Sequence, residues 1–428
     1  MEQRCSDVIG TGSNSTLSRR LYSSIKHPEE RERLPDWSTF LIKGTSKYLG
    51  FFLGPRANSC QWDTTVAKWK ARTVEIACTH ASAAISVFLY NSRAAPVLGY
   101  KSQLVPLPVT FKRAEKAGLH HLLHLATNTC DASTPYNLSQ FGGPKITNAH
   151  ALALSTALRV AVKTLPSWPC CVHALKVAAE EHQPAASWFS GKLSPPCWDS
   201  SPIACYLSDV VNGQGLSPLI RASTVGFLAK LDKARLNASM TCKIMVQKSA
   251  YATLIPVICP PTVIQLLIKR LSDNIPDVAP HAQAADWEQI FSVMKSLGSH
   301  AAMCCFKTYA NSWTTSRRFH EARRSTCIFG CAQPDDLAHY LSCVRLWRTI
   351  KFAVKGPVGK TPQDRLALVS PTKKRLQELA IAFTVFHTIK HSEKNSLQLA
   401  RDSDNFNSFV AIARSIAETA ARAHGRVQ

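Results

Sequence analysis

Acidic residues are scarce in this sequence. Its 428 residues include 28 Asp and Glu against 51 Lys and Arg, which leaves a formal net charge of +23. An excess of positive charge of this size favours polyanionic partners, of which nucleic acid is the commonest. A merely basic soluble protein would have the same charge, so the composition predicts a polyanion as partner without identifying it.

Long apolar runs are also lacking. The first four residues lead into polar sequence without the apolar segment of a secretory signal. One nearly uncharged run, residues 249–268, contains Pro256, Pro260 and Pro261, which would break a membrane-spanning helix. The sequence thus predicts a protein of the nucleus or cytoplasm that is neither secreted nor embedded in a membrane.

Disulfides are not expected, although the chain has 15 cysteines. A chain of this length can bury a core without covalent cross-links, and no secretory signal suggests an oxidising compartment. We therefore expect reduced thiols, most of them buried as small apolar groups and a few acting as metal ligands.

Catalytic motifs are absent as well. The sequence has no phosphate-binding loop of the GxxxxGK type, no GxSxG, no HExxH and no dinucleotide-binding fingerprint. Two-metal nucleotidyl transfer requires clustered carboxylates, and the single pair of adjacent aspartates is Asp335-Asp336. Pro35-Asp36 and Pro276-Asp277 are not followed by the rest of a nuclease pattern. No catalytic residue and no organic cofactor is predicted, and the chain as it stands is not expected to be an enzyme.

Strand signals are sparse, which predicts a mainly α-helical fold. Two short apolar runs, residues 39–42 and 48–53, flank a Gly-containing stretch at residues 43–47 and predict a β-hairpin that turns there. From Trp62 to Ile76 the apolar residues recur at helical spacing and form one stripe, which predicts a helix over this stretch.

Further helices are predicted by the same periodicity. They cover residues 151–162, 175–181, 218–236, 287–297, 376–387 and 406–417. Asp402 or Asp404 could cap the last of them. The expected domains are a loose N-terminus (1–36), a hairpin with a helical region (37–130), a helical linker (131–310), a basic approach with a metal site (311–350) and C-terminal helices (351–428).

One cluster predicts a zinc site. Four ligands lie within seventeen residues: Cys327, Cys331, His339 and Cys343. Structural zinc prefers four tetrahedral sulfur and nitrogen ligands, and four protein ligands leave no position for catalysis. Gly330 would let the backbone turn tightly before the second ligand, and Asp335 or Asp336 would begin a helix that carries His339.

Basic residues next to this cluster predict contact with phosphates. Arginine pairs and aromatic side chains alternate in residues 313–324, which fits phosphate binding combined with base stacking. A solvated helix face is the alternative. The residues predicted to contact nucleic acid are Lys68, Lys70, Arg72, Arg317, Arg318, Arg323 and Arg324.

Other cysteines and histidines predict no metal site. Cys170, Cys171 and His173 match no common ligand spacing, and the adjacent Cys304 and Cys305 are expected in the core. His120, His121 and His124 have helical spacing but no thiolate or carboxylate with them, so they are expected on a helix face.

Two separated stretches resemble one protein family. Residues 47–55, KYLGFFLGP, resemble the segment that follows the palm in reverse transcriptases of non-LTR retrotransposons, and residues 91–104 look like their thumb. The Cys–Cys–His–Cys cluster, followed by Leu346-Trp347, is similar to the zinc knuckle near their C-termini. The family's palm holds its three catalytic aspartates upstream of KYLG, and this chain is expected to lack that palm.

The resemblance implies a nucleic-acid-binding remnant of a reverse transcriptase, with a helical thumb and a structural zinc knuckle but no polymerase site. Two alternatives stay open: a Mg²⁺-dependent nuclease or polymerase with unrecognised carboxylates, and a zinc-stabilised protein-interaction module. Mg²⁺-dependent cleavage would identify the first, and failure to bind RNA or DNA at about 50 mM salt would favour the second.

Overall fold

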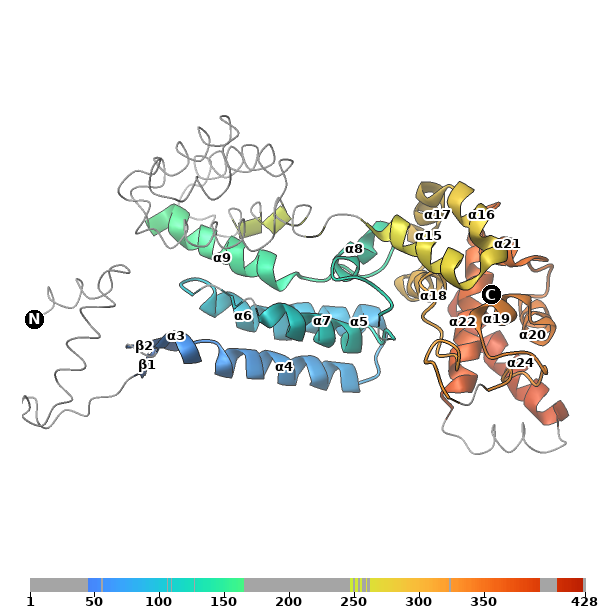
Figure 1. The fold of residues 1–428 in the computed structure, drawn as a ribbon, viewed down its shortest axis with the longest axis horizontal. Coiled ribbons are helices and arrows are strands. Elements are labelled where there is room, and N and C mark those ends of the chain that lie inside the picture. Colours follow the sequence, from blue (N-terminus) through green and yellow to red (C-terminus); the bar gives the residue numbers. More distant parts are fainter. Residues whose placement is uncertain are drawn as a thin grey trace, which may run out of the picture. The chain divides into compact units, whose positions relative to one another are not determined.

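The protein is mainly helical, as its sequence predicts (Figure 1). The computed structural model describes residues 45–164 except 55, 56, 106, 109 and 127, a few residues between 247 and 259, residues 262–392 except 323 and 324, and residues 406–425. The chain forms two compact units, each assembled from several separate stretches of sequence. We call them unit 1 (residues 1–72, 92–115 and 147–258) and unit 2 (residues 73–91, 116–146 and 259–428).

A short hairpin is the only sheet among the described residues. Its strands β1 (Ser46–Tyr48) and β2 (Phe51–Leu53) pair antiparallel, with Lys47 opposite Phe52. The predicted turn at residues 43–47 is therefore wrong: the chain turns at Leu49 and Gly50, whose φ angles are 45° and 87°. Both angles are positive, as a two-residue hairpin turn requires, and glycine adopts such angles without steric penalty. The first predicted run, residues 39–42, lies outside the described residues.

Unit 1 contains helices that pack around Trp69. The elements that lie wholly or partly in it are α3 (Ala57–Cys60), α4 (Asp63–Cys78), η4 (Tyr90–Ala94), α6 (Ala95–Lys101), α7 (Phe111–Leu122) and α9 (Ala149–Thr164). The Trp69 side chain is 1% exposed, and its ring meets the edge of Phe111 with 4.8 Å between ring centroids. The predicted apolar stripe of α4 is confirmed, since Trp62, Trp69 and Ile76 are all buried.

Replacing Trp69 with alanine should destabilise unit 1 by about 3–5 kcal/mol, because the cavity left by a buried aromatic ring is only partly filled by relaxation. Urea denaturation followed by circular dichroism measures the loss. Val74→Ala on the same helix is the matched control, since Val74 is 55% exposed, and it should change stability by less than about 0.5 kcal/mol. Equal effects of the two variants would contradict this packing.

Unit 2 contains a larger set of helices. They are α5 (Ala83–Leu89), α8 (Thr134–Asn137), η5 (Leu138–Phe141), α15 (Val263–Asn274), η6 (Pro276–Val278), α16 (Ala279–Ala284), α17 (Trp287–Lys295), α18 (Ser299–Tyr309), α19 (Leu337–Ser342), α20 (Val344–Val354), α21 (Pro362–Arg365), α22 (Lys373–Lys390) and α24 (Phe406–Ala423). Helix α22 contacts α18, α20 and α24. The ring centroid of Phe386, on α22, lies 4.6 Å from that of Trp313 and 4.7 Å from that of Tyr340. These aromatic rings form a core that joins α22 to the segment around the cysteine cluster.

Several helix predictions are confirmed. Predicted residues 151–162 lie within α9, 287–297 overlap α17, and 376–387 and 406–417 lie within α22 and α24. The predicted helices at 175–181 and 218–236, and the caps Asp402 and Asp404, lie outside the described residues. Cys304 and Cys305 are buried as expected, with 2% and 0% exposure. None of the helices in the described part of the chain is long and apolar enough to span a membrane.

Candidate metal centre

A tight loop presents the first two cysteines. The Cys327 amide donates to the Gln333 carbonyl (2.9 Å), and the Gly330 amide donates to the Cys327 carbonyl (3.0 Å). Gly330 has a φ of 78°, a conformation that favours glycine, so the predicted turn before Cys331 is confirmed. The amide of Phe329 also points at Cys327 Sγ (3.4 Å), which places a donor beside the sulfur.

Helices α19 and α20 present the other two ligands. Asp336 is the N-cap of α19: its Oδ1 accepts from the His339 amide at 2.8 Å, which confirms the predicted helix start. Cys343 follows α19 and caps α20, and its Sγ accepts from the Leu346 amide at 3.5 Å. The Cys343 side chain thus has two roles: it caps α20 and it belongs to the group of potential metal ligands.

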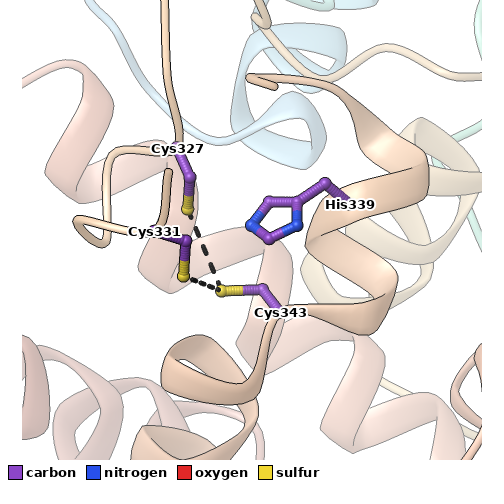
Figure 2. Close-up of side chains that lie close together, drawn as sticks. All are labelled: Cys327, Cys331, His339 and Cys343. Carbon is purple, nitrogen blue, oxygen red and sulfur yellow. Dashed lines mark hydrogen bonds between the residues drawn. The ribbon is translucent and has the colours of Figure 1, made fainter. Parts of the chain in front are cut away.

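The four side chains converge on one point (Figure 2). Cys343 Sγ lies 3.9 Å from Cys327 Sγ and 3.7 Å from Cys331 Sγ, and all four donor atoms lie within 4.8 Å of one another. Tetrahedral bonds of about 2.3 Å from a metal to sulfur put two sulfurs about 3.8 Å apart. His339 Nε2 is buried and has no hydrogen-bond partner. This Cys3His cluster can therefore hold one metal ion, which would use the orphaned nitrogen.

Ionisation within the Cys3His cluster is uneven. The hydrogen bond from Cys327 lowers the pKa of the Cys343 thiol, so Cys343 is the first to become a thiolate. The same shared hydrogen bond, together with burial, raises the pKa of Cys327, and burial raises the pKa of Cys331. Burial lowers the pKa of His339, which favours the neutral imidazole that binds metals. Three neighbouring thiolates repel one another, and the positive charge of a bound metal ion would offset this repulsion.

Asp335 anchors the cluster to the rest of unit 2. Its side chain is 0% exposed and its carboxylate accepts from the Ser316 amide (2.8 Å) and the Tyr340 hydroxyl (2.5 Å). Lys390 of α22 completes the set with Nζ 3.0 Å from Oδ2. Burial and the bond to Asp335 raise the pKa of Tyr340, so its phenol stays protonated. The buried Asp335 carboxylate thus connects three parts of unit 2: the basic segment of residues 313–324 through Ser316, helix α19 through Tyr340, and helix α22 through Lys390.

The predicted arginines at 317 and 318 lie in a cleft of about 500 Å³ beside the cluster. Arg317 Nη1 is 3.1 Å from Asp336 Oδ2, so this ion pair connects the basic segment of residues 313–324 to the N-cap of α19. Arg318 Nε donates to the Asn311 carbonyl (3.0 Å), and burial together with the nearby Arg270 lowers its pKa. The cleft also contains carboxylates, namely those of Asp273, Glu321 and Asp336. Arg323 and Arg324 lie outside the described residues.

The three basic residues predicted on α4 do not share a face. Lys68 and Lys70 are exposed, but two residues along a helix point in nearly opposite directions. Arg72 is half-buried and donates from Nη1 to the carbonyl of Arg93. Lys68 and Arg72 lie one turn apart on one side, and Lys70 lies on another.

A second basic surface was missed from the sequence. Helix α20, which begins directly after Cys343, has no acidic residue and exposes a row of basic side chains: Arg345, Arg348, Lys351 and Lys355. We call this row the α20 basic face. Arg348 and Lys351 have no ion-pair partner within the described part of the chain. Their spacing of three and four residues is the signal that could have identified it.

The predicted helix face at His120 and His121 is confirmed in part, because both lie on α7, whereas His124 lies beyond its end with a φ of 49°. His120 Nε2 contacts Cys130 Sγ at 3.7 Å, a pair rather than a ligand set. Cys170, Cys171 and His173 lie outside the described residues.

Comparison with known proteins places the chain in no family. No family model matches it, and no curated protein matches it significantly. The resemblance to non-LTR reverse transcriptases therefore stays a prediction, and the site itself is the basis for any functional proposal.

Proposed function

We propose that this chain binds RNA or DNA through a basic surface built on a structural zinc site. The observation that carries the proposal is that the α20 basic face begins at Cys343, a ligand of the Cys3His cluster. An ion held there would set the start and the orientation of α20. The metal would thus act on nucleic acid indirectly, by positioning cationic side chains.

Zinc is the metal that this donor set favours. Three thiolates exclude the hard cations Mg²⁺ and Ca²⁺, which take oxygen ligands, and a Cys3His set in a tetrahedral arrangement is typical of structural zinc. Because all four ligands come from the protein, no position is left for water or substrate at this ion.

The chemistry of the α20 basic face favours a nucleic-acid backbone. Arg348 and Lys351 are exposed on one side of α20, and the exposed Arg414 of α24 lies over the ring of Phe352 at 4.5 Å. Phe352 is itself 49% exposed, so an aromatic surface lies among the cations. Cations of this kind contact phosphates, and an exposed ring offers a stacking surface to an unpaired base. Binding would be strongly dependent on salt and weakly dependent on sequence.

This proposal agrees with the resemblance of the cluster to the zinc knuckle of non-LTR reverse transcriptases. We extend it accordingly: the chain would bind a template, primer or hybrid as the C-terminal part of such a protein does, without the catalytic aspartates. The arginine cleft at Arg317 and Arg318 would contribute beside α20, since Asp336 connects it to the same cluster.

The double variant Arg348→Ala/Lys351→Ala tests the proposal. Binding to single-stranded RNA, duplex DNA and an RNA–DNA hybrid should weaken about tenfold at low salt, because two phosphate contacts are lost. The slope of log affinity against log salt should fall by about 2 for the duplexes. Fluorescence anisotropy between about 50 and 200 mM salt measures both quantities.

Two further variants make the comparison specific. Lys295→Ala removes an exposed lysine of α17 and should leave binding unchanged. Lys68→Ala/Lys70→Ala tests whether α4 contributes, and Arg317→Ala/Arg318→Ala tests the cleft. Unchanged affinity of the Arg348/Lys351 variant at low salt would refute a role for α20. Absence of binding by the unmodified chain would refute the proposal and favour a protein-interaction module.

A further inference from the structure

A second group of metal-binding side chains lies in unit 2, apart from the Cys3His cluster. His300 and Cys304 are one turn apart on α18, and His424 follows the end of α24. The donor atoms of these three residues lie within 4.8 Å of one another. Cys304 Sγ is 3.9 Å from His300 Nε2, and the two imidazoles are parallel, with centroids 5.3 Å apart and 6° between planes. We call this group the His–Cys–His triad.

We propose that the His–Cys–His triad binds a second zinc ion, with His300, Cys304 and His424 as ligands and a fourth position left for water or another small oxygen ligand. Spacing i, i+4 on a helix directs two side chains to one face, as two ligands of a single ion require. One thiolate and two imidazoles suit zinc, and sites with three protein ligands typically keep a water in the fourth position. No other Cys, His, Asp or Glu joins the triad within the described part of the chain.

The surroundings of the triad hold its members in place. Cys304 is 2% exposed and His424 is 8% exposed, whereas His300 lies at the surface and gives access from solvent. The backbone of His424 is held at its carbonyl by Gln377 Nε2 (2.7 Å). Helix α22 lies beside both α18 and α24, so one element supports the two that carry ligands.

Thr384 of α22 orients the His424 ring. Its Oγ1 lies 2.9 Å from the Ala380 carbonyl oxygen, to which it donates, 3.1 Å from His424 Nε2 and 3.8 Å from Cys304 Sγ. When the hydroxyl donates to Ala380, it can accept from a proton on His424 Nε2, and that tautomer keeps the lone pair of Nδ1 for a metal. A ligating histidine commonly gives its other N–H to such an acceptor, which fixes the tautomer. Thr384 therefore contacts two members of the triad and is placed where a residue that orients a metal ligand would lie.

The charges around the triad are compatible with a divalent ion. A divalent ion held by two neutral imidazoles and one thiolate would keep one net positive charge. Lys307, one turn beyond Cys304, is a nearby cation that opposes metal binding, and burial lowers its pKa. On binding, the Cys304 thiol would release its proton, and the resulting thiolate would offset one of the two positive charges of the ion.

Zinc content of the purified full chain tests this site separately from the Cys3His cluster. After dialysis against metal-free buffer, mass spectrometry should find two zinc ions per chain. His300→Ala and Cys304→Ala should each retain one, since each removes a ligand of the triad only. Cys327→Ser should also retain one, and Cys304→Ala combined with Cys327→Ser should retain none.

The matched control is Cys305→Ala. Cys305 is also fully buried on α18, but its Sγ contacts the Leu376 carbonyl (3.2 Å) and it is not part of the triad. This variant should keep both ions. The proposal fails if the unmodified chain holds a single zinc that Cys327→Ser removes and His300→Ala does not. Because His300 is exposed, its substitution leaves the core intact and a loss of zinc cannot be attributed to unfolding.

Discussion

Replacing Cys343 with serine should remove the zinc ion that we propose for the Cys3His cluster and lower the melting temperature by about 10 °C or more. Structural zinc supplies about 10–16 kcal/mol in small zinc domains, and each kcal/mol lost shifts a domain of this size by about 2–4 °C. Cys343 is the thiol nearest to ionisation and lies within 3.9 Å of both other sulfurs, so its loss opens the tetrahedron. Mass spectrometry and differential scanning calorimetry measure the two effects.

Serine also separates the two roles of this residue. Cys343 caps α20, and serine is among the best N-cap residues, so Cys343→Ser preserves the cap while it weakens metal binding. Cys343→Ala removes both. If capping were the main role, the serine variant would retain the melting temperature of the unmodified chain, and that result would contradict a structural metal. Cys78→Ser, at an exposed free cysteine, is the control and should retain all bound zinc.

Replacing Asp335 with alanine should destabilise unit 2 by about 3 kcal/mol, the low end of the loss for a buried ion pair, because the Asp335 side chain is 0% exposed but that of Lys390 is 23% exposed. The variant leaves the Lys390 ammonium and the Tyr340 hydroxyl without the carboxylate that both contact at 3.0 Å or less. The amide of Ser316 loses its acceptor too. Urea denaturation at pH 7 measures the change in the free energy of unfolding.

A second variant distinguishes the ion pair from simple packing. Asp335→Ala/Lys390→Met removes both charges, and a buried pair replaced by apolar side chains is often neutral, so stability should partly return. Asp336→Ala, next in sequence, removes the cap of α19 and the contact with Arg317, and should lower stability by about 1 kcal/mol. Equal losses at Asp335 and Asp336 would show that the buried pair has no special role.

Local signals in the sequence were sufficient for the Cys3His cluster. All four ligands fall within seventeen residues, so a turn at Gly330 and the short helix capped by Asp336 bring them together without help from distant elements. The helices were predictable because their signal is also local in the sequence. An apolar stripe of helical period, such as that of α4, indicates which face of the helix is buried. The hairpin turn was misplaced because apolar runs alone do not specify strand register, whereas the backbone angles at Leu49 and Gly50 do.

Contacts between distant residues could be decided only by the tertiary structure. Asp335 was predicted to help begin a helix, but it turns into the core because Lys390, 55 residues away, provides its counter-ion. The spacing of the basic residues on α20 can be read from the sequence. Their exposure, however, depends on how α20 packs against α24 and α22. Cys304 was rightly expected in the core, and His300 lies one turn from it on α18, but only the tertiary structure places His424, which follows α24, beside this pair. The sequence by itself determined the helical class and the Cys3His cluster, since both depend on neighbours along the chain. The ion pair of Asp335 with Lys390, the exposure of the α20 basic face and the assembly of the His–Cys–His triad depend on packing between helices, which local sequence patterns do not specify.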